Sequence, residues 1–411
     1  MNIINFLIII LISTCIGKIP YSAIINFTNE NVELFGKGVE IFGGNINITM
    51  PGSYLVKGNC SEGTIKILAD SVSLYLENLE LSSSISSPIW IDKGLNDIKI
   101  NAIENVVLND FEDFDITSGD CATIKIKKRS KVSFKSQTSF ILGGYCENGI
   151  KGAANVSITF EQANGEYIIN SNKNGISSEG ILIFNGGNFN ISTIIGDAVQ
   201  SKPDENDTIS LGKILINDGN FNIQSHSDAF QAKNNIEIKK GNFNIITENG
   251  YNSSTFVKYT GSSKGFKVLN NDGIIKIYDG NFYLNTSDDA FHSKGNLTII
   301  NGNYTINALD DAFNTRFHLL IGRKDSQEGP NIKVLNCFEG IEGASIRIYS
   351  GDINVVSFED GINSANKNKS ENLYNSQKIT NFISIYGGNI SLYSNGYGLN
   401  SKGNIFIHGE I

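Results

Sequence analysis

The chain has 411 residues, more than one compact core usually holds, so several domains or a repeat architecture is expected. An apolar content of 40% is too high for a disordered chain. The net charge of −9, from 33 basic and 42 acidic residues, argues against nucleic acid and anionic membrane as partners, because both require clustered Lys and Arg. This charge is compatible with divalent cations and with neutral or calcium-bridged acidic ligands.

The first residues, Met1–Gly17, have the pattern of a secretory signal peptide. The apolar stretch from Ile3 to Ile12 is too short to span a bilayer, and small residues, Cys15 and Gly17, precede the expected cleavage site. We therefore expect a secreted, extracellular protein whose mature chain is residues 18–411. No later segment is long and apolar enough to be a membrane anchor, so membrane insertion is not expected.

Four cysteines remain after removal of the signal peptide: Cys60, Cys121, Cys146 and Cys337. Four cysteines allow three pairings, and the sequence does not choose among them or decide between disulfides and free buried thiols. Their wide spacing fits no zinc-binding pattern. Many N-x-S/T sequons, such as those at Asn190 and Asn303, are compatible with a secreted glycoprotein.

Two short phrases alternate along the chain and predict its architecture. One is Gly-Asn followed by an apolar residue, as in GGNFNI at Gly186 and KGNFNI at Lys240; the other is Asp-Ala-apolar, as in DAFQAK at Asp228 and DAFHSK at Asp289. Between them apolar and polar residues alternate, which is typical of strands with one buried face. We expect polar insertions within rungs, for example at Asn249–Ser263.

Many short strands separated by Gly and Asn, in a repeat of a few tens of residues, predict a β-solenoid whose rungs bury their inward side chains against one another. Leucine-rich and calcium-binding nonapeptide repeat patterns are missing from the sequence, and a sandwich or barrel would not keep this phrase order. The predicted fold class is therefore all-β, a parallel β-helix (β-solenoid) forming a single domain over residues 18–411.

Residues that recur once per rung should form columns. The Asn of the Gly-Asn phrase should form a ladder of stacked amides, with members Asn188, Asn220, Asn242, Asn281 and Asn303. The following aromatic should form a stack in the core, with members Phe189, Phe221, Phe243, Phe282 and Tyr304. Trp90 is either a platform for a sugar ring or a packing residue.

Three segments resemble a known family. They are EGIEGASIRIYSGDINVVSFEDGINSA at 339–365, GDAVQSKPDENDTISLGKILINDGNFNI beginning at Gly196, and GVEIFGGNINITMPGSYLVKGNCSEGTIKI beginning at Gly38. In their residues and their order along the chain they resemble the calcium-binding β-helix carbohydrate-binding proteins, which are secreted by cellulolytic anaerobic bacteria. The resemblance extends over nearly the whole mature chain.

The resemblance implies a right-handed parallel β-helix similar to that of polysaccharide lyases. It also implies bound calcium ions (Ca²⁺) and a polysaccharide partner, either acidic pectin such as polygalacturonate or cellulose. This chain departs from the family pattern in having Asp-Ala where bacterial members favour Asp-Gly, and in lacking the Asp at the rung of Tyr397.

Acidic residues at the start of rungs are the candidate calcium ligands. Carboxylates in a column about 4.8 Å apart repel one another unless a cation lies between them or their pKa values rise. Calcium binds such oxygen ligands. The predicted ligands are Asp197, Asp228, Asp288, Asp289, Asp310, Asp311, Glu339, Glu342 and Asp360. For any single Asp, the alternative is that it caps its own turn.

A basic residue follows several of these acids five positions later. These residues are Lys202, Lys233, Lys294 and Arg316. As a column beside calcium, they could bind the carboxylates of a uronate polymer. The structural alternative is that each forms an ion pair with an acid of a neighbouring rung.

The sequence favours binding over catalysis. None of the four His lies in a nucleophile or metal-binding motif. Lys294 or Arg316 could act as the base of a calcium-dependent lyase, so a lyase is the runner-up, and a structural or adhesive surface protein is the third hypothesis. We expect a non-catalytic, monomeric carbohydrate-binding protein.

Overall fold

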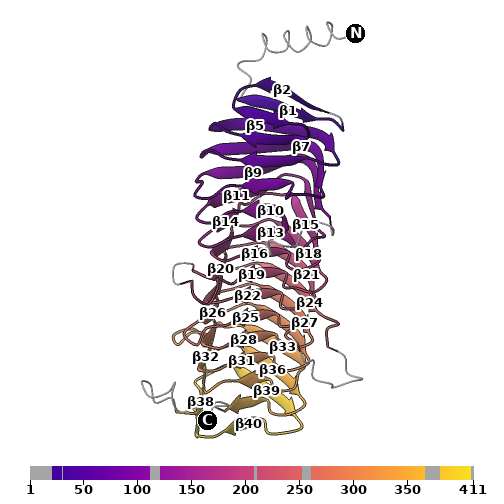
Figure 1. Ribbon diagram of the computed structural model, residues 1–411. Helices are drawn as coiled ribbons and strands as arrows, with labels where there is room; N and C mark the ends of the chain where they lie inside the picture. The colour runs from indigo at the N-terminus through magenta and orange to yellow at the C-terminus, as the bar shows by residue number, and fades with distance from the viewer. Residues whose placement is uncertain are drawn as a thin grey trace.

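The computed structural model describes residues 21–29, 31–111, 121–207, 211–251, 261–365 and 380–408. Within these residues every helix or strand assigned is a strand, and the strands stack into one rod (Figure 1). The predicted signal peptide, Met1–Gly17, and most of the predicted insertion at Asn249–Ser263 lie outside the described residues. The described part of the chain holds no helix with the length and apolarity to cross a membrane.

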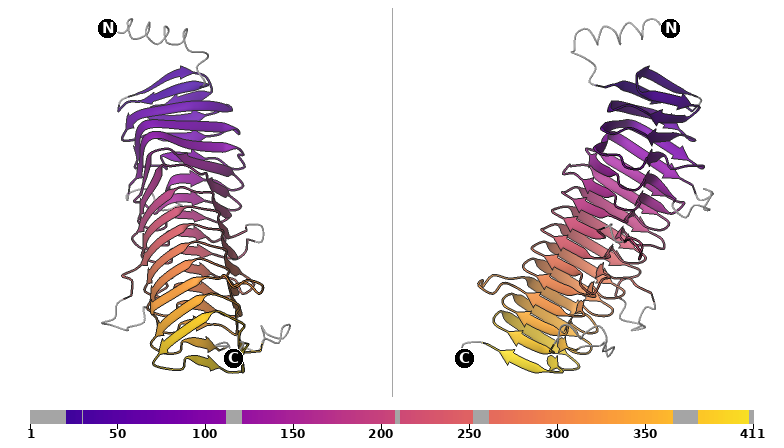
Figure 2. Two further views of the ribbon diagram at one scale, coloured as in Figure 1. Left: turned by 180° about the vertical axis from the view of Figure 1, so that it is seen from behind. Right: turned by 60° about the vertical axis from the view of Figure 1, so that its left-hand side comes forward.

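From β10 onward, successive strands of the chain enter three columns in turn (Figure 2). The first column has short strands: β6 (Thr64–Ile67), β8 (Ile89–Ile91), β10 (Ala122–Ile126), β13 (Asn148–Gly152), β16 (Ile176–Ser178), β19 (Val199–Ser201), β22 (Phe230–Ala232), β25 (Phe266–Val268), β28 (Phe291–Ser293), β31 (Phe313–Thr315), β34 (Ile341–Glu342), β37 (Ile362–Ser364) and β40 (Leu399–Ser401).

The other two columns follow in chain order. The second column comprises β11 (Lys131–Ser136), β14 (Ser157–Phe160), β17 (Ile181–Phe184), β20 (Lys213–Ile216), β23 (Asn235–Ile238), β26 (Ile274–Ile277), β29 (Asn296–Ile299), β32 (His318–Ile321), β35 (Ser345–Ile348), β38 (Phe382–Ile385) and β41 (Asn404–Ile407). The third comprises β12 (Ser139–Gly144), β15 (Glu166–Ser171), β18 (Asn188–Thr193), β21 (Asn220–Ser225), β24 (Asn242–Thr247), β27 (Asn281–Thr286), β30 (Asn303–Ala308), β33 (Asn331–Asn336), β36 (Asp352–Ser357) and β39 (Asn389–Ser394).

The N-terminal end of the rod differs from the rest. Two antiparallel pairs, β1 (Ala23–Phe27) with β2 (Val32–Gly36) and β3 (Val39–Phe42) with β4 (Asn45–Ile48), precede the parallel rungs. Three long strands, β5 (Gly52–Cys60), β7 (Val72–Ser83) and β9 (Ile98–Asp110), then span the second and third columns together. The two halves of β9 pair with β11 and β12, so the columns separate at this point.

Neighbouring rungs pair in parallel and in register, which brings equivalent residues together. In the third column Asn220 lies between Asn188 and Asn242. The Nδ2 of Asn220 donates to the Oδ1 of Asn188 at 2.7 Å, and the Nδ2 of Asn242 donates to the Oδ1 of Asn220 at 2.7 Å. The same bonds extend the ladder through Asn281 to Asn303, so the predicted amide ladder is confirmed.

The glycine of the Gly-Asn phrase is required at the turn between the second and third columns. Gly241 has a φ of 145°, and a Cβ there would lie 3.0 Å from the backbone oxygen of Gly219 and 3.1 Å from the ring of Phe243. Residues with a side chain disfavour this backbone conformation and this close approach. Stacking of one turn on the next therefore explains why Gly recurs before Asn.

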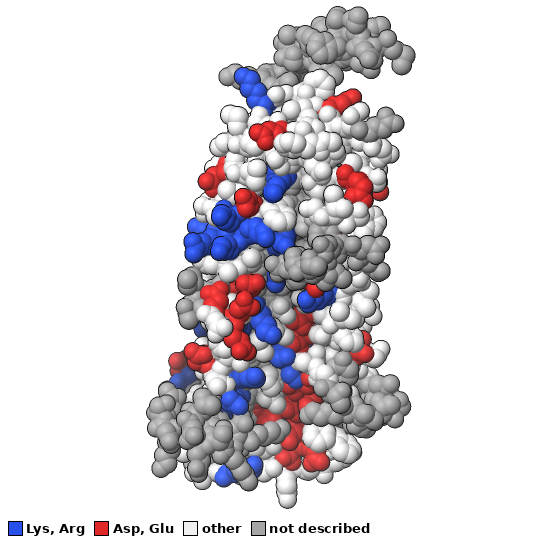
Figure 3. Space-filling view, in the orientation of Figure 1, with Lys and Arg blue, Asp and Glu red and all other residues white. Residues whose placement is uncertain are grey.

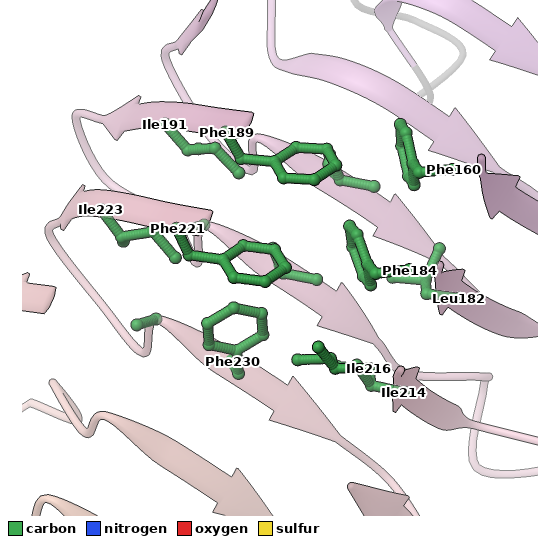
Figure 4. Packing of buried hydrophobic residues seen from close by; sticks show 14 of the residues in the cluster. Phe160, Leu182, Phe184, Phe189, Ile191, Ile214, Ile216, Phe221, Ile223 and Phe230 are labelled. Atoms are coloured by element: carbon green, nitrogen blue, oxygen red, sulfur yellow. The ribbon is translucent and has the colours of Figure 1, made fainter. Parts of the chain in front are cut away.

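The aromatic residues that follow these Asn point inward and form the predicted core stack (Figure 4). Phe243 is stacked between Phe221 and Phe282, with ring centroids 5.1 and 4.7 Å away. A second stack, in the first column, contains Phe230 and Phe266, whose centroids are 4.9 Å apart. The rings of this second stack contact Phe221 and Phe243 edge to face, an arrangement that aromatic pairs favour.

The structure resolves the cysteine pairing that the sequence left open. Cys121 and Cys146 form a disulfide with Cα atoms 5.9 Å apart, and it joins two successive turns that lead into the first column. Cys60 and Cys337 are buried free thiols.

Phe243→Ala should lower the free energy of unfolding by about 3–5 kcal/mol, because it opens a cavity in the middle of one aromatic stack and beside the other. Tyr283→Ala is the control, because this side chain points outward and is 49% exposed. It should lower the free energy of unfolding by less than about 0.5 kcal/mol. Denaturant titration followed by circular dichroism measures both values. Equal losses would contradict the assignment of the inward face.

Candidate functional site

The predicted acidic ligands lie beside the first column. Its strands point their end residues inward and their middle residue outward, so Val199 and Ser201 are buried on either side of Gln200. The residue two positions before each of these strands lies in the turn. We call the column that these equivalent turn positions form the acid row. Its acidic members are Asp197, Asp228, Asp289, Asp311, Glu339 and Asp360. The outward middle positions, which we call the outer row, include Gln200, Gln231, Lys267, His292, Asn314, Glu342, Asn363 and Asn400.

Each acid of the row helps to hold the next rung. One carboxylate oxygen of Asp197 accepts the N–H of Asp228 at 2.9 Å, and that of Asp289 accepts the N–H of Asp311 at 3.1 Å. The second carboxylate oxygen accepts a hydrogen bond from the outer-row side chain three residues later in the chain. The side chain of Gln200, for example, donates to Asp197 at 2.5 Å. These acids bond to the neighbouring rung, and so have a structural role that differs from the predicted capping of their own turns.

A lysine interrupts the row. Lys264 occupies the acid position before β25, between the rungs of Asp228 and Asp289. Its Nζ lies 2.6 Å from Asp288 and 2.8 Å from Asp289. Lys267, in the outer row of the same rung, lies 2.9 Å from Asp228. The phrase Lys-Gly-Phe-Lys-Val is the sequence signal for this rung, since Phe266 keeps the place of the aromatic in Asp-Ala-Phe.

Burial and these ion pairs shift the pKa values of the acids in opposite directions. Burial, and next the charge of Asp228, raises the pKa of Asp197 to about 7. Burial also opposes ionisation of Asp228, but Lys267 and hydrogen bonds hold the pKa of Asp228 below its ordinary value. Asp288 likewise has a raised pKa, first through burial and next through Asp289. The pKa of the Asp289 carboxyl is lowered despite burial, because His292 and Lys264 stabilise its charge.

Among the described residues, carboxylates converge in two places. The first cluster is Asp288, Asp289 and Asp310, and the second is Asp311, Glu339 and Glu342; in each, one oxygen per residue lies within 4.8 Å of the others. The ammonium of Lys264 already lies against the first cluster. In the second, Asn314 donates to both Asp311 and Glu342, at 3.0 Å to the latter. A set of hard oxygen donors fits calcium, so the second cluster is the better candidate site.

The predicted basic residues form a separate row at the far end of the short strands. The N–H groups of Lys202, Lys233, Lys294 and Arg316 each bond to the preceding rung, which places one basic residue per rung except where Leu269 intervenes. The Nζ of Lys233 donates to the backbone oxygen of Asp204 at 2.9 Å, and Arg316 donates to Asn271 at 2.6 Å. The ion pairs of Asp228, Asp288 and Asp289 involve instead Lys264, Lys267 and His292, which do not belong to the five-residue spacing of acid and base.

The outer face of the first column is polarised (Figure 3). Basic side chains gather over its upper part, near β10 and β13, and acidic side chains gather toward its lower end. Another candidate surface lies on the third column, where a groove of about 760 Å³ follows the amide ladder from β18 to β30. Amides can bond sugar hydroxyls as donors and acceptors.

Comparison with known proteins agrees with this architecture. A family model for carbohydrate-binding domain-containing proteins matches residues 42–312. A solved structure of a polysaccharide lyase-like protein from C. thermocellum, a gadolinium derivative, has a TM-score of 0.51 and 20% sequence identity, covering 62% of this chain and 96% of that chain. At this identity the likeness shows the fold alone. No curated protein matches the chain.

Lys267→Met should destabilise the protein by about 3–5 kcal/mol, because it leaves the buried charge of Asp228 without its cation. Adding Asp228→Asn in the same chain should recover much of that loss, since the neutral amide keeps an oxygen for the N–H of Lys264. Denaturant unfolding at neutral pH measures both. A single variant as stable as the parent protein would contradict the ion pair.

Asp197 should make stability depend on pH. Between its ordinary pKa of 3.8 and its folded pKa of about 7, the folded protein keeps a proton that the unfolded chain releases. Its contribution to the free energy of unfolding therefore falls as pH rises through this window, by on the order of a few kcal/mol. Asp197→Asn has no such proton, so the difference in stability between parent and variant should change between pH 4 and pH 7. A difference that stays constant would refute the raised pKa.

Proposed function

Because the chain belongs to the family of carbohydrate-binding domain-containing proteins, we propose that it is a secreted, non-catalytic protein that binds acidic plant cell-wall polysaccharide through calcium. The expected ligand is polygalacturonate, and the proposed calcium ligands are Asp311, Glu339 and Glu342. The family supports a polysaccharide partner. The convergence of these three carboxylates is the observation that supports calcium.

The second cluster places three carboxylates close together in a buried setting. Asp311 is 1% exposed, Glu339 9% and Glu342 3%, so three carboxylates are withdrawn from most of their solvent. Carboxylates this close destabilise one another unless a cation or a proton intervenes. Asn314 supplies hydrogen bonds to two of them but no charge. In the first cluster, Lys264 lies against Asp288 and Asp289.

Bound calcium would offer vacant coordination positions to uronate carboxylates, which alone would be repelled by an acidic surface. The residues of the chain hold the cluster in place. The N–H of Glu339 donates to Asp311 at 3.3 Å, and Asn363 donates to Glu339 at 3.1 Å, so two successive rungs position the ligands. The predicted basic row could then contact further carboxylates of the polymer.

The protein should be retained on immobilised polygalacturonate in calcium and released by a chelator, without forming unsaturated chain ends. The combined substitutions Asp311→Asn and Glu342→Gln should weaken calcium binding at least about tenfold and abolish this retention. Both substitutions keep the shape and the oxygen acceptors. Asp352→Asn is the matched control, because this exposed acid lies on β36, at a position of the third column that is Asn in β33 and β39.

Each other outcome of this experiment has a defined meaning. Retention that a chelator leaves unchanged would overturn the role of calcium. New unsaturated ends would identify a lyase, the runner-up function. Retention on cellulose alone would move the binding site to the amide groove, and no retention on either polymer would favour a structural or adhesive role.

A further inference from the structure

The N-terminal part of the first column carries positive charge around the single tryptophan of the chain. In the ladder, Trp90 of β8 pairs with Lys66 of β6 on one side and with Lys125 of β10 on the other. Lys127 follows β10, and its N–H donates to the backbone oxygen of Ile91 at 2.9 Å. The register therefore brings three lysines to one indole, and we call these four residues the Trp90 cluster.

The three ammonium groups lie close to the indole ring. The Nζ atoms of Lys66, Lys125 and Lys127 are 5.1, 5.3 and 4.6 Å from its centroid. Trp90 lies between lysines of the two neighbouring rungs, and so does not present a bare face on which a sugar could stack. The π system of one indole attracts these cations, but it carries no net charge with which to neutralise them.

Acidic partners distinguish other lysines of this face from Lys66 and Lys127 of the Trp90 cluster. Lys151 in the outer row pairs with Glu179 at 3.8 Å, and Lys267 pairs with Asp228 at 2.9 Å. Among the described residues, no ion pair joins Lys66 or Lys127 to a carboxylate. Lys128 and Arg129, next in the chain, are exposed and add further positive charge. The result is the basic band visible in Figure 3.

The indole itself lacks a hydrogen-bond acceptor. The Nε1–H of Trp90 is buried and has no partner among the described residues. A buried donor without an acceptor is unfavourable. An oxyanion bound by Lys66 and Lys127 would bring a negative charge to these two lysines and could also supply an acceptor.

We propose that the Trp90 cluster is a metal-independent binding site for the carboxylate or sulfate groups of an acidic saccharide. The choice of a saccharide rests on the proposed function, but the site does not depend on calcium. Lysines are suited to this role, since each is a mobile point charge with three donors. A nucleic acid is disfavoured, because the net charge of −9 repels a long polyanion outside this patch.

The position of the cluster is complementary to the calcium site. Between β8 and β31 the first column has eight steps, which at about 4.8 Å each separate the two sites by roughly 40 Å. One acidic polymer could thus be bound directly by lysines at one end of the face and through calcium at the other. A short oligosaccharide would reach only one site, which allows the two to be measured separately.

The fluorescence of Trp90 provides the test, because no other tryptophan contributes. With chelator present, a short oligogalacturonate should change the indole emission in a saturable way, and a neutral oligosaccharide of equal length should not. The combined substitutions Lys66→Gln and Lys127→Gln should weaken the response about tenfold or more. Lys333→Gln, an exposed lysine on β33, is the matched control. Lys127→Gln alone serves if the double variant is poorly folded.

The outcomes separate this site from the calcium site. The proposal would be overturned if the fluorescence did not respond, responded equally to the neutral sugar, or responded unchanged in the lysine variants. Calcium-dependent retention on polygalacturonate is a separate measurement, and its result does not depend on this one. A stronger response to a sulfated oligosaccharide would assign the site to sulfate esters instead of uronates. Tighter binding of an oligonucleotide would overturn the assignment to a saccharide.

Discussion

In-register stacking of the rungs is the constraint on which the rest of the structure depends. Parallel pairing places each residue about 4.8 Å from its equivalent in the next rung, so every recurring residue must pack against a copy of itself. Asn and Phe pack favourably against copies of themselves, since amides bond to amides and rings stack on rings, as Asn220 and Phe221 do. An acidic residue does so only if N–H donors, protons or cations compensate its charge.

The acid row shows how the fold and the candidate site share the same residues. Asp197 and Asp289 each bond to the backbone of the next rung, so they stabilise the stack whatever ligand the protein binds. Lys264 then compensates two acids of one rung, Asp288 and Asp289, whereas the second carboxylate cluster lies near β31 and β34. The distribution of charge along the outer face of the first column therefore follows from the residue type that occupies each repeated position in successive rungs.

The sequence predicted the features that depend on period and repetition. Alternation of apolar and polar residues gave the strands, and the Gly-Asn-aromatic phrase gave the amide ladder and the core stack. The rung of Lys264 was missed because a long insertion precedes it and Lys replaces Asp. The site at Asp311 and Glu342 could not be distinguished from the other acids, because it depends on the register between rungs. The Trp90 cluster comes from early rungs that lack the repeated phrases.

We propose that calcium binds where Asp311, Glu339 and Glu342 converge, on a β-helix whose other acids mainly stabilise the stack. The most direct measurement is an anomalous difference map from crystals grown with calcium and collected at long wavelength. We expect a peak within coordination distance of these three carboxylates and none between Asp197 and Asp228, where Lys267 compensates the charge of Asp228. A map with no peak at the three carboxylates, or with its calcium along the rest of the acid row, would contradict it.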